Sequence, residues 1–77
     1  MKARKRPIVV DAVQAVEGTM SALPGVYRDC DRHAWVINTL EGVLEVRPGD
    51  WVITGIVGEH YPIRGDIFDA TYDIVTL

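Results

Sequence analysis

The feature that most constrains the fold of this 77-residue chain is the set of three turn signals in residues 39–72. Glu41-Gly42, Pro48-Gly49 and Gly58-Glu59 recur at regular spacing, and β-branched or aromatic residues flank each of them. Gly and Pro between such residues are typical of tight turns that join neighbouring strands. The pattern therefore predicts an antiparallel sheet built from short hairpins.

The first two turns predict registers that agree with each other. With Glu41-Gly42 as a two-residue loop, Ile37 faces Val46, and with Pro48-Gly49 in a type II turn, Val46 faces Trp51. Because side chains alternate between the two faces of a strand, one apolar face then collects Trp35, Ile37, Leu44, Val46, Trp51 and Ile53. Burial of these side chains, at roughly 1.5–3 kcal/mol each, is expected to dominate the stability of the fold.

The third turn predicts a different face for the strand that follows it. With Gly58-Glu59 as the loop, Ile56 faces Tyr61 on the side of the sheet opposite Trp51. Either Gly55 is a bulge that exchanges the two faces, which we expect, or the sheet has a second apolar surface. That surface would contain Leu40, Val43, Val52 and Ile56. It would need cover from another element or from a second copy of the chain, so a homodimer is one outcome.

The two ends of the chain are predicted to close the sheet. Pro7–Val16 and Thr71–Leu77 alternate like strands, and neither has a hairpin neighbour, so we expect them to pair with each other. Asp66–Ala70 is predicted to form one short helical turn that Asp66 caps. Glu17–Arg32 is expected to be a loop with at most one helical turn, near Thr19–Leu23. The expected fold is mostly β (β or α+β), a small antiparallel meander that forms a roll or a partly closed barrel.

Charge divides the chain into a flexible basic arm, residues 1–6, and a single β-rich domain, residues 7–77. Four of the eight Lys and Arg residues lie in the arm, namely Lys2, Arg4, Lys5 and Arg6. The other four accompany eleven Asp and Glu residues, which gives the domain a net charge of −7. An acidic domain repels phosphate backbones, so nucleic acid is disfavoured as a partner and the arm holds the candidate contacts. The alternative is that the arm is simply a solvated terminus.

Cysteine usage and hydropathy favour a cytoplasmic compartment without a membrane anchor. Cys30 is the single cysteine, which excludes an intrachain disulfide and suits a reducing environment. No stretch approaches the roughly 20 apolar residues of a membrane-spanning helix. Residues 7–16 alternate like a strand and do not resemble the apolar core of a signal peptide.

The polar residues do not form a recognisable catalytic or metal-binding pattern. Residues 29–33 concentrate potential ligands, but zinc needs three or four ligands that converge, and adjacent strand residues point to opposite faces. His60 has no positioned partner or nucleophile motif beside it, and the glycines of residues 55–59 do not match a phosphate-binding loop. We therefore predict no enzymatic activity, no metal and no cofactor. Trp35 and Trp51 are predicted to be core residues more than a ligand platform.

Three segments of the second half carry a combined motif. They read PGDWVITG at Pro48–Gly55, GEHYP at Gly58–Pro62 and DIFDATY at Asp66–Tyr72. Together they resemble the small phage and prophage proteins grouped as the PGDYG family, and KRPIVVDAVQ at residues 5–14 is similar to the first strand of that family. The chain departs from the family in the middle, where residues 17–32 look shorter than the helix of many members. It also has Arg64-Gly65 in place of the usual Lys-Pro.

The resemblance implies a phage-encoded accessory protein without enzymatic activity, because the family has no established activity or catalytic residues. Such a protein would act in the cytoplasm of a bacterial host by binding a host protein that the sequence does not identify. The candidate partner contacts are His60, Tyr61, Arg64, Tyr27 and His33. One alternative is a nucleic-acid-associated regulator that uses the basic arm. Another is a virion or assembly component that self-associates through the second apolar surface.

Overall fold

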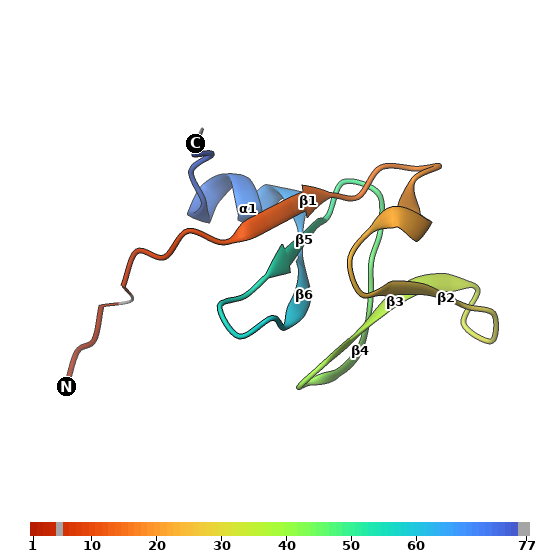
Figure 1. The fold of residues 1–77 in the computed structure, drawn as a ribbon, viewed down its shortest axis with the longest axis horizontal. Helices are drawn as coiled ribbons and strands as arrows, with labels where there is room; N and C mark the ends of the chain where they lie inside the picture. Colours follow the sequence, from red (N-terminus) through yellow and green to blue (C-terminus); the bar gives the residue numbers. More distant parts are fainter. Residues whose placement is uncertain (5, 76–77) are drawn as a thin grey trace.

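The computed structural model describes residues 1–4 and 6–75 and shows a mostly β, antiparallel fold, as the sequence predicts. Figure 1 traces the elements along the chain. In the described residues they are β1 (Asp11–Gln14), the 3-10 turn η1 (Met20–Ala22), β2 (Val26–Asp29), β3 (Ala34–Thr39), β4 (Gly42–Glu45), β5 (Trp51–Thr54), β6 (His60–Ile63) and α1 (Gly65–Thr71).

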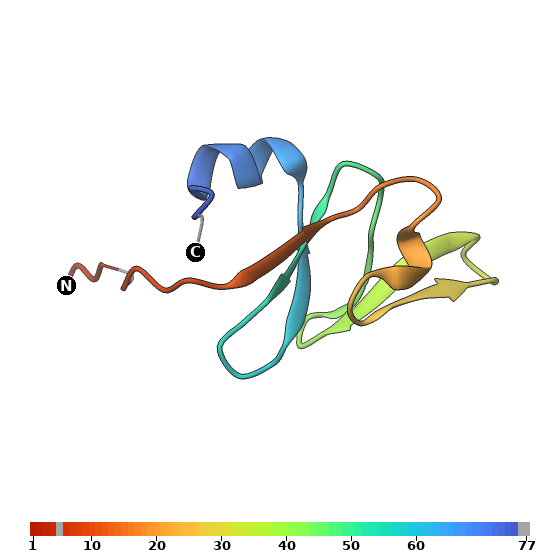
Figure 2. The same ribbon diagram turned by 45° about the horizontal axis from the view of Figure 1, so that its top comes forward.

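The strands form two three-stranded sheets, with strand orders β1-β5-β6 and β2-β3-β4. The chain leaves the first sheet after β1, builds the second sheet with β2 to β4, and returns for β5 and β6 (Figures 1 and 2). The expected single meander is therefore divided in two. Neither sheet closes into a barrel, since each keeps its own edge strands in the part of the chain that the structure describes.

The β3–β4 hairpin has the predicted faces in a shifted register. Ile37 lies opposite Leu44, two residues from its predicted partner, and the loop is Leu40-Glu41. Gly42 follows the loop with a φ of 111°, a value that favours glycine. The Thr39 hydroxyl donates to the Gly42 carbonyl oxygen at 2.8 Å and so closes the turn. Because the shift is two residues, every side chain stays on its predicted face.

The Pro48-Gly49 turn forms as predicted, but it joins the two sheets instead of two paired strands. The Asp50 N–H donates to the Arg47 carbonyl oxygen at 3.0 Å, and Gly49 has a φ of 96°. Ala15 then holds the turn, because its N–H donates to Asp50 at 2.7 Å and its carbonyl accepts from Gly49 at 2.8 Å. These bonds align β5 with β1, so the predicted pairing of β4 with β5 is wrong.

The β5–β6 hairpin also differs from its predicted form. Thr54 lies opposite His60, and the Gly55 N–H donates to the Glu59 carbonyl oxygen at 2.8 Å. A three-residue loop therefore connects Gly55 to Glu59, and Gly58 supplies the positive φ, 84°. The predicted two-residue loop and the expected bulge at Gly55 are both wrong, because β5 and β6 pair without interruption up to this loop.

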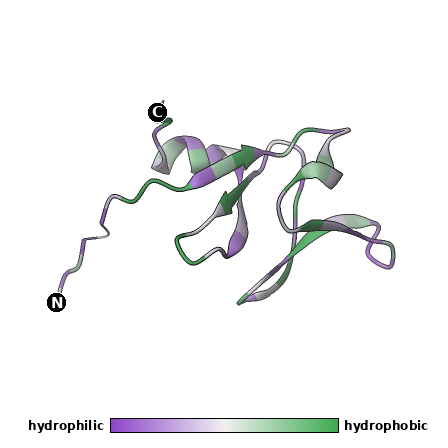
Figure 3. Ribbon diagram, viewed as in Figure 1, coloured by the Kyte–Doolittle hydropathy of each residue, from purple (hydrophilic) through white to green (hydrophobic). Residues whose placement is uncertain are grey.

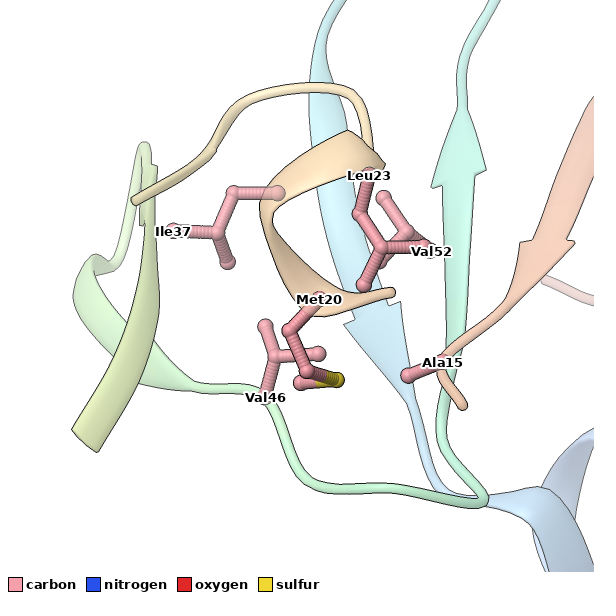
Figure 4. Close-up of a cluster of buried hydrophobic side chains, with 6 residues drawn as sticks. All are labelled: Ala15, Met20, Leu23, Ile37, Val46 and Val52. Atoms are coloured by element: carbon pink, nitrogen blue, oxygen red, sulfur yellow. The ribbon is translucent and has the colours of Figure 1, made fainter. Parts of the chain in front are cut away.

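The main core lies between the two sheets and is closed by η1. Figure 4 shows its six buried side chains, which are Ala15, Met20, Leu23, Ile37, Val46 and Val52. Val26 and Trp35 pack against it. The predicted apolar face is therefore only partly correct: Ile37 and Val46 belong to this core, whereas Leu44 remains 36% exposed and Trp51 lies on the opposite side of β5 from Val52.

The predicted second apolar surface does not exist as one surface. Val52 is fully buried in the main core, while Leu40 lies exposed in the β3–β4 loop and Ile56 in the β5–β6 loop. Val43 belongs to β4, in the other sheet from Val52. These four residues lie apart because the structure contains two sheets where a single sheet was expected.

A third layer forms where α1 packs on the outer face of the β1-β5-β6 sheet (Figures 1 and 2). The Phe68 ring stacks on Trp51, with centroids 4.1 Å apart and planes at 12°, and Tyr72 stacks on Phe68 at 5.0 Å. A seven-residue helix is too short to be stable alone in water. The aromatic stack therefore holds α1 in place.

The start of α1 corrects the predicted helix cap. Arg64 occupies the N-cap position, its carbonyl oxygen accepts from the Phe68 N–H at 2.8 Å, and no side chain caps the helix. Asp66 lies two residues after Arg64, in the first turn, where its carboxylate accepts from the Ile67 N–H and pairs with Arg64 at 2.8 Å. An acidic residue in the first turn still favours the helix through its dipole.

The remaining differences concern the ends and the loop that was expected at residues 17–32. η1 confirms the helical turn near Thr19–Leu23, but β2 within the same segment was missed. The first strand is shorter than predicted, and residues 72–75 form no strand, so the predicted pairing of the two ends is wrong over the described residues. Residues 76–77 of the predicted last strand lie outside the described residues.

Candidate functional site

A broad groove of about 1060 Å³ opens beside α1 on the outer face of the β1-β5-β6 sheet. Four segments line it: the approach to β1 and its first residues, the β5–β6 hairpin, α1, and the residues that follow α1. Its apolar lining includes Ile8, Val10, Trp51, Tyr61, Tyr72 and Ile74. Clefts of this size with mainly apolar walls are typical of binding sites.

The groove exists because α1 is too short to cover the sheet. Side-chain alternation places Trp51 and Ile53 of β5, and Tyr61 and Ile63 of β6, on this face. At 1.5 Å per residue, the helix extends for about 10 Å. It buries Phe68 on the sheet but leaves Tyr61 at the wall of the groove.

Aromatic rings form one side of the groove. Trp51, Phe68 and Tyr72 make a continuous stack, and Tyr61 lies beside Tyr72. Burial, followed by hydrogen bonding and charge interaction with Tyr72 and by the negative charge of Glu59, raises the pKa of Tyr61 to about 12. Tyr61 is therefore a neutral hydroxyl at physiological pH, which suits it to hydrogen bonding and not to proton abstraction.

The rim of the groove is mainly acidic. Asp11, Glu59 and Asp73 line it from three different segments, and Arg6 is the basic residue among its lining residues. Two further carboxylates, Asp66 and Asp69, are exposed on α1. A partner that carries positive charge next to its apolar residues would be complementary to this rim.

Exposed aliphatic side chains surround the opening. Ile56 in the β5–β6 loop is 71% exposed and Ile74 after α1 is 72% exposed, and Ile8 and Val9 before β1 are also exposed. Figure 3 shows hydrophobic residues along the approach to β1 and in the loop between β5 and β6. Apolar residues gathered around a groove mark an interaction surface better than isolated exposed side chains do.

Of the predicted contact residues, Tyr61 lies in the groove and His60 does not. His60 is the preceding residue of β6 and points to the other face of the sheet. Its Nδ1 is 3.0 Å from the Thr54 hydroxyl oxygen, in hydrogen-bond contact. Its ring also packs against Gly25, where an added Cβ would lie 2.9 Å from the ring. These contacts indicate a structural histidine.

The other three predicted contact residues are distributed over separate elements. The Tyr27 hydroxyl, on β2, donates to the Asn38 side-chain oxygen at 2.8 Å. His33 is exposed in the β2–β3 turn with a φ of 53°. Arg64 is exposed before α1 and pairs with Asp66. The structure thus brings the five candidates into no single patch.

The polar segment 29–33 stabilises its own turn. The Asp29 carboxylate accepts from the N–H groups of Asp31 and Arg32 at 3.0 and 3.2 Å, and it pairs with the Arg32 guanidinium at 3.5 Å. Cys30 is a free, exposed thiol. Over residues 1–4 and 6–75, no three His, Cys, Asp or Glu side chains lie where they would hold a metal ion.

The basic arm lies apart from the sheets. Lys2, Arg4 and Arg6 are exposed, and the arm extends away from the body of the molecule (Figures 1 and 2). Lys5, the fourth predicted arm residue, lies outside the described residues. No helix in the described part of the chain has the length and apolar character needed to cross a membrane.

Sequence reasoning identified Tyr61 but missed most of the groove. Phe68 in α1 and Tyr72, the C-cap residue, are four residues apart, a spacing that would have indicated that the two rings lie on one side of the helix. Ile8 and Ile74 come from the two ends of the chain, which were predicted to lie side by side as paired strands and not as two parts of a groove lining. Comparison of the chain with family models, with curated proteins and with solved structures found no match.

Proposed function

We propose that this protein is a small non-enzymatic binding domain that holds an extended segment of another protein in the groove beside α1. The observation that carries this proposal is the groove itself: it is large, open and apolar, it has an aromatic side, and its rim is acidic. The resemblance to phage and prophage proteins motivates a partner in the cytoplasm of a bacterial host.

The lining defines the chemistry of the partner segment. An extended segment presents alternate side chains to the same side, so aliphatic or aromatic residues at alternate positions would enter the groove. Lys or Arg residues beside them would face Asp11, Glu59 and Asp73 at the rim. The charge pairs would contribute mainly to specificity and to the rate of association, whereas the apolar contacts would provide most of the affinity.

A selection from a random peptide library tests this chemistry without knowledge of the host partner. We expect the selected peptides to share apolar residues at alternate positions, flanked by Lys or Arg. The double substitution Ile56→Ser and Ile74→Ser should weaken their binding at least about tenfold, since it removes two apolar side chains from the rim. Both side chains are exposed, so the fold should tolerate the change.

Leu40→Ser is the matched control, because Leu40 is fully exposed but lies in the β3–β4 loop of the other sheet. It should bind the selected peptides like the wild type. Peptides without the apolar and basic pattern, or equal losses in both variants, would refute the proposal. Host proteins retained by the wild type and by Leu40→Ser, but not by the double variant, are then the candidate partners.

The basic arm supports a second candidate function, contact with nucleic acid. The exposed Lys2, Arg4 and Arg6 side chains follow one another on an extended segment, where each could neutralise a phosphate. This function predicts a salt-dependent mobility shift of DNA or RNA that is lost when residues 1–6 are deleted. A shift that survives the deletion, or none at low salt, would exclude the arm.

A further inference from the structure

The outer edge of β1 has no strand beside it. β1 is the first strand in the order β1-β5-β6, and in the described part of the chain nothing pairs with its other side. A free edge presents a row of unpaired N–H and C=O groups to any strand that approaches it. The edge therefore offers a backbone binding surface next to the groove, which residues 6–12 of the same segment also line.

The hydrogen bonds of Ala15 establish which residues face outward. Its N–H and its carbonyl both point toward the β5 side, where they bond to Asp50 and Gly49. In an antiparallel pair, successive residues direct their backbone groups to opposite sides. Ala12 and Gln14 therefore direct theirs to the free edge, and Val10 does the same if the strand is extended toward the N-terminus.

This edge lacks the usual protection against pairing. Natural edge strands carry Lys residues, internal Pro or bulges that discourage a partner. Residues 7–16 contain one charged residue, Asp11, and their proline, Pro7, is at an odd-numbered position that makes no outward hydrogen bond. Val9 and Val13 are 65% and 46% exposed, and Ile8 and Val16 are exposed as well.

Charge favours a second copy of the same chain as the strand that approaches. The arm carries four basic residues in six, whereas the rest of the chain has a net charge of −7. Antiparallel pairing of two β1 edges would run the arm of each copy along the partner, past Gln14 and toward Glu17. The basic arm of each copy is thus attracted to the acidic domain of the other copy, whereas two acidic domains without arms would repel each other.

We propose that two copies of this chain pair through the outward edge of residues 6–14, which comprise β1 and the segment before it, with a twofold axis at Val10, to form one continuous six-stranded sheet. In this register Val10 faces Val10 of the second copy, Ile8 faces Ala12, and Arg6 faces Gln14. The outward backbone groups of even-numbered residues then bond to one another. The register gives a partner to residues 6–10, which extend beyond the paired length of β1.

Such a dimer goes beyond the proposed binding function. Residues 6–12 take part in both sites, because they line one wall of the groove while the dimer uses the outward backbone groups of the same segment, so the two grooves of the dimer lie next to the joined edges. A partner with two copies of the target segment would then bind with higher avidity.

Sedimentation of the full chain from low to high micromolar concentration measures the dimer, and two substitutions test the edge. Gln14→Pro removes an outward N–H but no bond to β5, whereas Gln14→Ala keeps the N–H and is the matched control. The proline should weaken self-association at least about tenfold, because the symmetric dimer loses two hydrogen bonds. Val9→Lys places a positive charge on the same edge before β1 begins. Because Val9 is exposed and makes no strand pairing within one copy, the fold should tolerate this substitution.

Disulfide cross-linking tests the register in a Cys30→Ser background, which removes the exposed native thiol. Val10→Cys should form a covalent dimer on mild oxidation, since facing residues at a hydrogen-bonded position are about 5.5 Å apart. Val16→Cys should not, because the register places the two copies of this residue far apart.

Three results would overturn the proposal: a wild-type monomer at every concentration, a dimer that neither Gln14→Pro nor Val9→Lys weakens, or cross-linking at Val16 and not at Val10. The Ile56→Ser and Ile74→Ser double variant should dimerise normally. The experiments can therefore refute peptide binding in the groove and dimerisation through the edge independently of each other.

Discussion

Substitution of Phe68 by alanine tests whether α1 is an integral layer of the fold. The Phe68 side chain is only 4% exposed and lies between Trp51 and Tyr72, with ring centroids 4.1 and 5.0 Å away. Removal of a buried Phe costs about 3–5 kcal/mol, from lost apolar transfer and from the cavity that remains. Because α1 covers only part of the sheet and the site can relax, we expect about 3 kcal/mol, near the lower limit of this range.

This loss is large for a domain of 77 residues. At roughly 0.05–0.15 kcal/mol per residue, the whole fold is stable by about 4–12 kcal/mol. Urea titration followed by tryptophan fluorescence measures the difference in the free energy of unfolding between Phe68→Ala and the wild type. Phe68→Leu is the control, since it keeps most of the apolar volume and should cost less than about 1.5 kcal/mol.

The two results would separate two views of α1. A loss of about 3 kcal/mol, together with a weaker helical signal in circular dichroism, fits a helix that the aromatic stack holds on the sheet. A loss below about 1 kcal/mol would mean that α1 is loosely attached. The wall of the groove would then not be a fixed surface, and the binding site as described would be refuted.

Three further predictions concern the backbone, the tyrosine of the groove and a surface ion pair. Gly65→Ala should cost about 1–3 kcal/mol in a urea titration, because its Cβ would lie 2.6 Å from a main-chain carbonyl oxygen, and an unchanged urea midpoint would contradict this close approach. The pKa of Tyr61 is higher in the folded state than in the unfolded state, so its contribution to stability is complete below pH 10.0 and is lost as pH rises toward about 12. Between these pH values the free energy of unfolding should therefore fall more for the wild type than for Tyr61→Phe. An identical pH dependence of the two proteins would contradict this prediction. Arg47→Ala removes the exposed ion pair with Glu45 and should leave the urea midpoint unchanged, whereas a clear shift would show that the pair matters.

The local turn chemistry of the chain was predictable, because each turn requires particular residues. Gly42, Gly49 and Gly58 all adopt positive φ at or beside the predicted turns. The exact pairing was not determined by this chemistry. A shift of two residues at the first hairpin keeps the same side chains on the same face, so the pattern of apolar residues cannot distinguish the two registers.

The partner of β5 was not predictable from neighbouring residues. Trp51, Val52 and Ile53 are consecutive apolar residues, a pattern that indicates a strand buried on both faces. Because only one buried face was predicted, β5 was expected to pair with β4, the strand that precedes it in the sequence. In the structure Val52 faces the main core and Trp51 faces α1, while the hydrogen bonds of Ala15 attach β5 to a strand from the other end of the chain.

The candidate site was less predictable than the fold for the same reason. Tyr61 was identified from its place near a turn, but the walls of the groove combine residues 6–12 with residues 71–75. These two segments were predicted to lie together as paired strands, whereas the groove that they line depends on how α1 packs on the sheet. The net negative charge of the domain, which can be counted in the sequence, agrees with the acidic rim of the groove.

The two tryptophan indoles provide the most direct measurement of where a partner binds. Trp51 lines the groove, whereas Trp35 packs against the core between the sheets, so each indole N–H reports on a different side of the molecule. Titration with a selected peptide, followed by ¹H–¹⁵N correlation spectra, should shift the Trp51 indole resonance to saturation and leave that of Trp35 in place. Saturable movement of the Trp35 resonance with a stationary Trp51 would contradict the account.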